Sequence, residues 1–145
     1  MNLVTAAPYA AGIAFVVFAL SYSSGLIVLR RNAWMLPAGL AVAFLAWSLA
    51  AIVLEGPLGF WTEHTRNLWG IQIWFDLLLA GSMALIFIVP KAKARGMNPV
   101  IWVVLMFLTG SIALLAMTAR LLYLQEKAES TKAAPARAPA AGAAS

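Results

Sequence analysis

Residues Leu68–Gly81 read LWGIQIWFDLLLAG, an almost unbroken apolar run that has one aspartate, Asp76, inside it. The run continues to about Pro90, so it is long enough for a helix to cross the hydrocarbon core of a membrane, which takes about 20 residues. An aspartate at the centre of such a helix costs on the order of 2.5–3.5 kcal/mol on insertion scales. We therefore expect Asp76 to face neighbouring protein rather than lipid, and to be neutral, paired or in contact with water.

The whole chain has the composition of a membrane protein. Of its 145 residues, 63% are hydrophobic and 10% are charged, and the mean hydropathy is +0.90, whereas soluble domains carry about 25% charged residues. The sequence predicts an all-α fold, an integral membrane four-helix bundle with up-down-up-down order, within residues 1–125. The predicted helices cover about residues 7–29, 33–54, 68–90 and 99–124.

The positions of lysine and arginine predict the orientation of these helices. The loops after the first and third helices are basic, whereas the loop between the second and third holds Arg66 beside acidic side chains. The basic residues of the first and third loops are Arg30, Arg31, Lys91, Lys93 and Arg95. Because short basic loops stay in the cytoplasm, we expect a multi-pass protein of the bacterial inner membrane with both termini in the periplasm.

The sequence predicts different structures for the two ends of the chain. The N-terminal stretch has no basic region before its apolar run, so it is not expected to be a cleaved signal peptide, and the first helix should remain in the mature protein. Residues 126–145 are rich in alanine and proline and lack the large apolar side chains needed to offset chain entropy. We expect them to form a disordered tail.

Several kinds of site and partner are excluded by composition. The chain has no cysteine and one histidine, which leaves no disulfide or thiolate chemistry and argues against a metal site. No phosphate-binding glycine loop or hydrolase motif is present, so we expect no cofactor. The net charge of +5 is explained by cytoplasmic loops, and no nucleic-acid partner is expected.

Four polar side chains are predicted to converge in the outer half of the bundle: Glu55, Gln72, Asp76 and Arg120. Gln72 and Asp76 lie one turn apart on one helix face. If residues 99–124 form one helix antiparallel to the third helix, Arg120 approaches the outer surface near Asp76. Glu55, at the outer end of the second helix, is a competing partner. Two interpretations stay open, a structural clasp between helices or a desolvated acid that binds or protonates a ligand.

Three tryptophans, Trp47, Trp69 and Trp74, are candidates for a pocket or an interface between helices. Tryptophans near the membrane surface more simply form the interfacial aromatic belt that anchors helices in a bilayer. Ring packing between helices is the default for the deeper Trp47 and Trp74. The sequence does not separate these roles from the walls of an apolar ligand pocket.

Three stretches within residues 67–125 carry a resemblance to a known group of proteins. They are NLWGIQIWFDLLLAG, VPKAKARGMNP and TGSIALLAMTARLLYL. They resemble a group of small, uncharacterised bacterial multi-pass membrane proteins that combine a Phe-Asp-Leu acid, a basic loop ending in Gly-Met-Asn-Pro, and a Thr-Gly-Ser helix ending in Ala-Arg-Leu. The resemblance implies that Asp76, Gly110 and Arg120 are signature positions and implies no particular activity.

The sequence favours a non-enzymatic binding or assembly component, with the lipid bilayer and a membrane protein or second copy as partners. One alternative is a membrane enzyme acting on an apolar lipid or isoprenoid, with Asp76 or Glu55 as general acid in a pocket walled by Trp69 and Trp74. A second alternative is an oligomeric proton-coupled transporter, since an acid inside a membrane helix is typical of such proteins.

Overall fold

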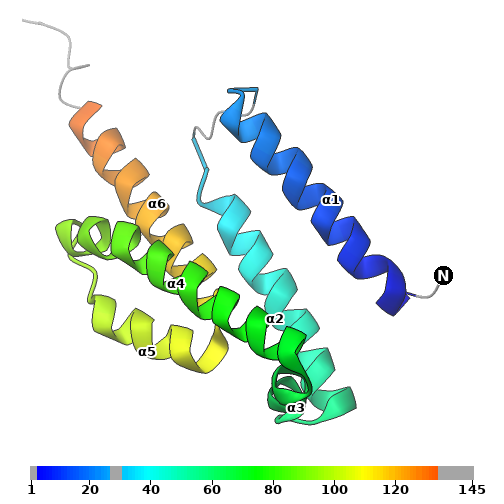
Figure 1. Ribbon diagram of the computed structural model, residues 1–145. Helices are drawn as coiled ribbons and strands as arrows, with labels where there is room; N and C mark the ends of the chain where they lie inside the picture. Colours follow the sequence, from blue (N-terminus) through cyan, green and yellow to red (C-terminus); the bar gives the residue numbers. More distant parts are fainter. Residues whose placement is uncertain (1–2, 27–30, 134–145) are drawn as a thin grey trace, which may run out of the picture. The chain divides into compact units, whose positions relative to one another are not determined.

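The computed structural model describes residues 3–26 and 31–133, and every regular element within these ranges is helical. The all-α prediction is therefore confirmed. The structure divides into two compact units, one containing α1 and the other containing the remaining helices, and each is described by itself. The helices are α1 (Leu3–Ser23), α2 (Met35–Glu55), α3 (Gly59–Thr65), α4 (Leu68–Ala94), α5 (Pro99–Thr109) and α6 (Ser111–Ala133) (Figure 1).

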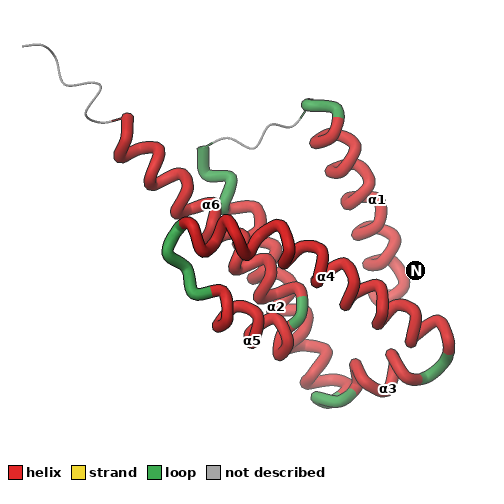
Figure 2. The backbone as a smooth tube through the Cα atoms, turned by 60° about the vertical axis from the view of Figure 1, so that its left-hand side comes forward, coloured by secondary structure: helices red, strands yellow, loops and turns green. Residues whose placement is uncertain are grey.

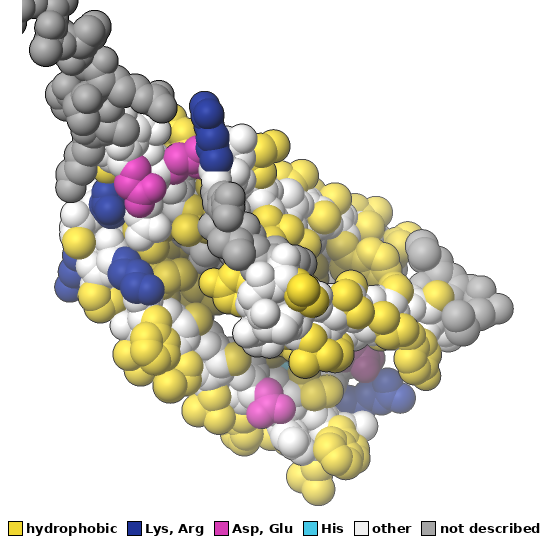
Figure 3. All heavy atoms as spheres, turned by 90° about the horizontal axis from the view of Figure 1, so that it is seen from above, with side chains coloured by type: hydrophobic (Ala, Val, Ile, Leu, Met, Phe, Trp, Pro, Cys, Tyr) yellow, Lys and Arg dark blue, Asp and Glu magenta, His cyan; other side chains and the backbone are white. Residues whose placement is uncertain are grey.

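Three helices are long and apolar enough to cross a membrane. They are α1, over Thr5–Ser23, together with α2 and α4. Each corresponds to a predicted membrane helix, and hydrophobic side chains cover most of the described surface seen in Figure 3. Exposed apolar surface of this extent is what lipid tails solvate, so the composition and the helices agree on a membrane protein.

The structure replaces the fourth predicted helix, residues 99–124, by two shorter ones. Gly110 ends α5 with φ 59°, and its backbone N–H donates to the carbonyl oxygen of Met106 at 2.7 Å. A positive φ is readily adopted by glycine and breaks the right-handed helix. With 11 residues, α5 is about 16 Å long, roughly half the thickness of a hydrocarbon core of about 30 Å.

Helix α6 runs back in the opposite direction to α5 (Figures 1 and 2). The backbone N–H of Asn32 donates to Glu126 Oε2 at 3.0 Å, and the rings of Trp34 and Tyr123 meet edge to face with centroids 5.8 Å apart. The far part of α6 therefore lies beside the start of α2. Because Ser111 is only about 18 Å back along the helix from Tyr123, the turn at Gly110 lies part-way along α2.

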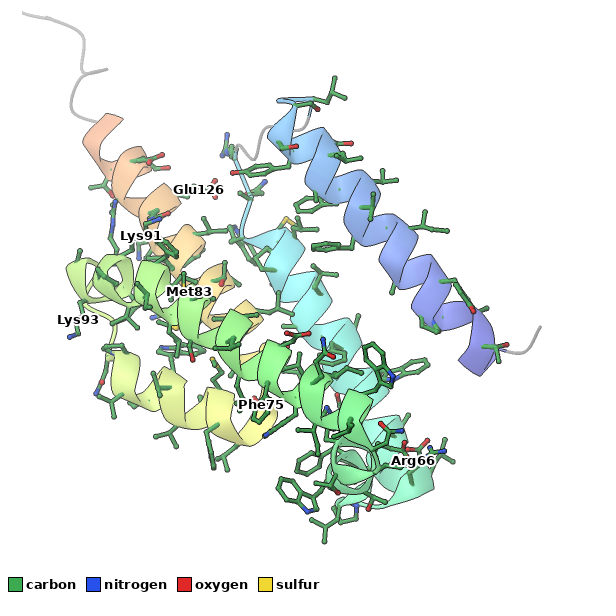
Figure 4. All side chains as sticks on the ribbon, in the orientation of Figure 1. Arg66, Phe75, Met83, Lys91, Lys93 and Glu126 are labelled. Carbon is green, nitrogen blue, oxygen red and sulfur yellow. The ribbon has the colours of Figure 1, made fainter. Side chains whose placement is uncertain are left out.

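The third loop lies at this same end of the unit. Figure 4 shows Lys91, Lys93 and Glu126 together there and Arg66 at the opposite end. The third loop thus lies near the far part of α6. Of the basic residues of the first loop, Arg30 lies outside the described residues and Arg31 belongs to the unit of α1. A single fourth helix would instead have carried the C-terminal segment to the Arg66 end.

The core of the larger unit is small and centres on α6. Ala113, Met117 and Leu121 of α6 are buried at intervals of one turn, and Met117 is 1% exposed. Around them pack α2, α5 and, less extensively, α4. Two further buried positions are Ala41 of α2 and Ala92 of α4. Small side chains at such positions let helix backbones approach closely, as is usual in membranes.

Two stretches differ from the sequence predictions. Helix α6 continues to Ala133, into the stretch predicted to be disordered from residue 126, while the remaining tail residues 134–145 lie outside the described residues. The connection between α2 and α4, predicted to be a loop, contains the short helix α3. The first of these differences follows from Leu124 to Ala133 having ordinary helix formers and no proline or glycine.

Candidate functional site

Helix α4 begins with a side-chain cap and continues without interruption past Asp76. The Oδ1 atom of Asn67 accepts from the backbone N–H of Gly70 at 2.9 Å, which satisfies one of the free donors of the first turn. Pro90, predicted to end the helix, lies inside it, and α4 ends only at Ala94. Asp76 is therefore held on a regular helix, and its direction follows from helix geometry.

One face of α4 packs against the rest of its unit. On this face a Cβ atom at Gly81 would lie 2.8 Å from the methyl carbon of Met106 in α5, so α5 approaches α4 closely there. Ala92 is 0% exposed. Trp74 is half-buried against α3. We call Trp74, Gly81 and Ala92 the packed face of α4.

The opposite face of α4 carries Asp76. A helix turns by about 100° per residue, so Asp76 points about 160° away from Trp74 and about 140° away from Gly81. Its side chain is exposed, as are the others on this side. The name Asp76 face is used below for five exposed residues of α4: Gln72, Asp76, Ala80, Met83 and Phe87. Met83, labelled in Figure 4, is 54% exposed.

Asp76 and Gln72 have no hydrogen-bond or ion-pair partner within the unit of α2 to α6. Among the described residues of this unit, neither side chain takes part in a hydrogen bond or an ion pair. The prediction that these two residues share a face holds. The expectation that neighbouring helices of the same bundle cover Asp76 is not met by α2 to α6.

The structure separates Arg120 from Asp76. From Asp76 to Gly81 is about 7.5 Å along α4, and from Met106, which faces Gly81, to Pro99 is about 10.5 Å along α5. Arg120 lies as far beyond the Gly110 turn as Pro99 lies before it, so the two residues are roughly 18 Å apart in depth. The predicted approach of Arg120 to Asp76 assumed one continuous helix, which the turn at Gly110 prevents.

Glu55 is also apart from Asp76. It ends α2 and is exposed, and a Cβ atom at Gly59 would lie 3.4 Å from its Cβ. Glu55 thus flanks the start of α3, and in the described structure α2 does not pack against α4. Of the four side chains predicted to converge, the structure keeps only Gln72 and Asp76 together.

An aromatic cluster joins α3 to α4. The ring of Trp74 lies 5.2 Å from that of His64, 6.4 Å from that of Phe60 and 6.5 Å from that of Trp61, measured between centroids. The Nδ1–H group of His64 donates to the carbonyl oxygen of Phe60 at 2.6 Å, which fixes the ring. Aromatic pairs at these separations contribute about 0.5–1.5 kcal/mol each beyond burial.

The close crossing of α3 over α4 requires Gly70. A Cβ atom there would lie 2.5 Å from the carbonyl oxygen of Glu63 and 3.0 Å from that of His64. From the sequence, Phe60 is expected to belong to the interfacial aromatic belt and His64 to be solvated in the loop, and no role is predicted for Gly70. The spacing of Phe60 and His64, four residues apart beside Trp61, was the available signal for a short helix with one aromatic side.

The other two candidate tryptophans stay outside this cluster. Trp47 is 49% exposed and Trp69 is 71% exposed, as expected of side chains that face lipid or the interface. Trp69 does border an open pocket of about 330 Å³ at the α3–α4 junction. The pocket is lined by Glu63, His64, Arg66, Asn67, Trp69, Gly70 and Ile73.

This pocket has little that would hold a charged ligand or a metal ion. Its arginine, Arg66, is already 3.1 Å from Glu63, and both side chains are more than half exposed. Within the described residues, no group of three histidine, cysteine or acidic side chains has the arrangement of a metal site. Neither Asp76 nor Glu55 lines the pocket.

Comparisons with known proteins add no relative: no family model, no curated protein and no solved structure matches the chain. The resemblance over residues 67–125 therefore stays a prediction. The geometry described above, and above all the position of Asp76 on an otherwise apolar helix, carries the functional argument.

Proposed function

We propose that the chain is a non-enzymatic assembly component of a bacterial inner membrane, and that it associates with another membrane protein chain through the Asp76 face. The observation that carries this proposal is the direction of Asp76. It lies within a helix long and apolar enough to cross a membrane, and it points away from the side on which α4 packs against α3, α5 and α6.

The energetics of the bilayer favour a cover for this face. A central aspartate costs on the order of 2.5–3.5 kcal/mol when it inserts alone, and Gln72 one turn away adds further polar atoms to the same lipid-facing stripe. Hydrocarbon offers no hydrogen bonds. A helix that supplies donors and acceptors to this stripe therefore binds the face through hydrogen bonds as well as through apolar contacts.

The proposed topology has three crossings and a re-entrant hairpin. With the basic loops in the cytoplasm, α1, α2 and α4 cross, α5 enters from the cytoplasmic side to about half depth, and α6 returns. The hydrogen bond from Asn32 to Glu126 at 3.0 Å supports this route. The C-terminal segment is then cytoplasmic and the N-terminus periplasmic, in place of two periplasmic termini.

The enzyme alternative receives less support from the geometry. It needs Asp76 or Glu55 as an acid within a pocket walled by Trp69 and Trp74. Since Asp76 and Trp74 point in nearly opposite directions from α4 and Glu55 lies beside α3, these residues do not converge. No observation favours the proton-coupled transporter over an assembly role.

Photo-crosslinking in native membranes tests the assembly role. A photoreactive amino acid is placed at Met83 on the Asp76 face, and a matched probe is placed at Leu78, which is 46% exposed and points about 160° away from Asp76. We expect a protein adduct from position 83 and mainly lipid adducts from position 78. Lipid adducts alone from both positions, or a link from position 83 to α1 of the same chain, would contradict the proposal.

A further inference from the structure

The Asp76 face carries a hydrogen-bond donor and an acceptor one helical turn apart. The amide of Gln72 offers two N–H groups and one carbonyl oxygen, and the carboxyl group of Asp76 offers oxygen acceptors in either protonation state. Neither side chain has a hydrogen bond or ion pair among the described residues of the unit that contains α2 to α6. The two residues are about 6 Å apart along the axis, a separation that two facing side chains can span.

The basic residues of the chain lie at other depths. Arg66 lies at the start of α4 and Lys91 near its end, and Arg120 lies roughly 18 Å from Asp76 along the helix axes. A second copy of the chain therefore brings no cation to the depth of Asp76. It brings another Gln72 and another Asp76, because copies inserted in the same orientation have the same residues at the same depth.

Resting on the proposed assembly role, we propose that the occupant of the Asp76 face is a second copy of the chain, related by a two-fold axis along the membrane normal. Gln72 of each copy then donates to the Asp76 carboxyl group of the other, so the face satisfies itself. Two-fold dimers with such self-complementary faces are the commonest symmetric assemblies. Ala80, one turn further along, leaves room for the two helices to approach.

Cysteine crosslinking tests this pairing without background, because the chain has no cysteine of its own. Two full-length copies with different tags, both carrying Met83→Cys, are expressed together and oxidised in native membranes. We expect a disulfide dimer that contains both tags. The control variant Leu78→Cys, on the other side of α4 and about 7.5 Å from Met83 along the helix axis, is expected to stay monomeric under the same conditions.

Replacing Gln72 and Asp76 measures how much these two side chains contribute to self-association. In lipid nanodiscs or vesicles, energy transfer between labelled copies should show self-association weakened about five- to thirty-fold by the double change Gln72→Leu and Asp76→Leu. Asp76→Asn keeps an acceptor at this position and should remain close to wild type. Equal association of the double variant and the wild type would overturn the proposed pairing.

The outcomes separate this inference from the broader proposal. A position-83 adduct with a foreign protein, without mixed-tag dimers, would overturn the second-copy inference and leave the assembly role standing. Crosslinks from position 83 to α1 of the same chain, or adducts with lipid alone, would overturn both. The cysteine variants keep Gln72 and Asp76 intact, so a missing mixed-tag dimer is not explained by loss of the polar pair.

Discussion

The two faces of α4 differ in what they expose. The packed face carries Trp74 against the rings of α3, Gly81 against Met106, and Ala92 with no exposed surface. The Asp76 face carries two polar side chains with no hydrogen bond or ion pair among the described residues of α2 to α6. In a membrane, an exposed leucine needs no explanation because lipid tails are equally apolar. An exposed aspartate does need one, and in the proposed assembly the explanation is that further protein binds to this face.

The largest expected effect concerns the hairpin that defines the packed face. If α5 reaches only half depth, a reporter fused after Ala133 should be active only as a cytoplasmic enzyme. A reporter inserted beside Pro57 should be active only as a periplasmic one. Each signal should be close to all-or-none. Periplasmic activity of the fusion after Ala133 would mean that the chain crosses the membrane a fourth time. The contact between α5 and Gly81 could then no longer be used to define the packed face.

The next largest effect is expected from a substitution at Gly70, where α3 crosses closely over α4. Gly70→Val places side-chain carbons where the carbonyl oxygen of Glu63 lies, 2.5 Å from the first of them. We expect a loss of about 3 kcal/mol, the upper end for overpacking, because backbone must move. Thermal unfolding in mild detergent measures it. The control Gly39→Ala meets nothing within 4 Å and should leave the unfolding temperature within about a degree of wild type or slightly higher, given alanine's helix preference.

A matched pair of alanine substitutions compares the two faces directly. Ala92→Leu on the packed face enlarges a side chain with 0% exposure and should lower the free energy of unfolding by about 2 kcal/mol. Ala80→Leu on the Asp76 face should leave the unfolding of the dissociated chain unchanged and reduce self-association. Equal destabilisation by both in dilute detergent would mean that the chain itself covers the Asp76 face.

The smallest expected effect concerns the turn at Gly110. Its φ of 59° and ψ of −130° form a combination that residues with a Cβ atom rarely adopt, so Gly110→Ala should cost on the order of 1–2 kcal/mol while the hairpin persists. The unfolding midpoint in detergent measures the cost. An increase in stability would indicate that alanine lets α5 and α6 merge into one helix, and the fusion reporter after Ala133 should then change sides.

The sequence predicted the helices well where a long apolar run has clear ends. The helices predicted over about residues 33–54 and 68–90 correspond to α2 and α4, because length and hydropathy decide such segments. The run over residues 99–124 was equally long, but a glycine inside an apolar run is compatible with both a helix and a turn. Only packing of α6 against α2, with Tyr123 beside Trp34, shows which occurs.

The predicted polar cluster shows a similar limit of prediction from sequence. Gln72 and Asp76 share a face because four residues separate them on one helix, which is local information. Bringing Arg120 or Glu55 to Asp76 required the relative depth and direction of two helices, and one turn at Gly110 changed both. The helix-wheel relation of Trp74 and Asp76, two residues apart, was readable from the sequence and already argued against a shared pocket.

The central claim is that Asp76 points away from the packed face of α4 and is covered there by another helix in the membrane. A spin-label scan along residues 72–87 in lipid bilayers, with oxygen accessibility as the signal, tests it most directly. We predict two protected sides per turn, one centred on Gly81 and one on Asp76, with lipid-accessible positions such as Phe75 and Ile86 between them. A single protected side centred on Gly81, with high oxygen accessibility beside Asp76, would contradict the claim.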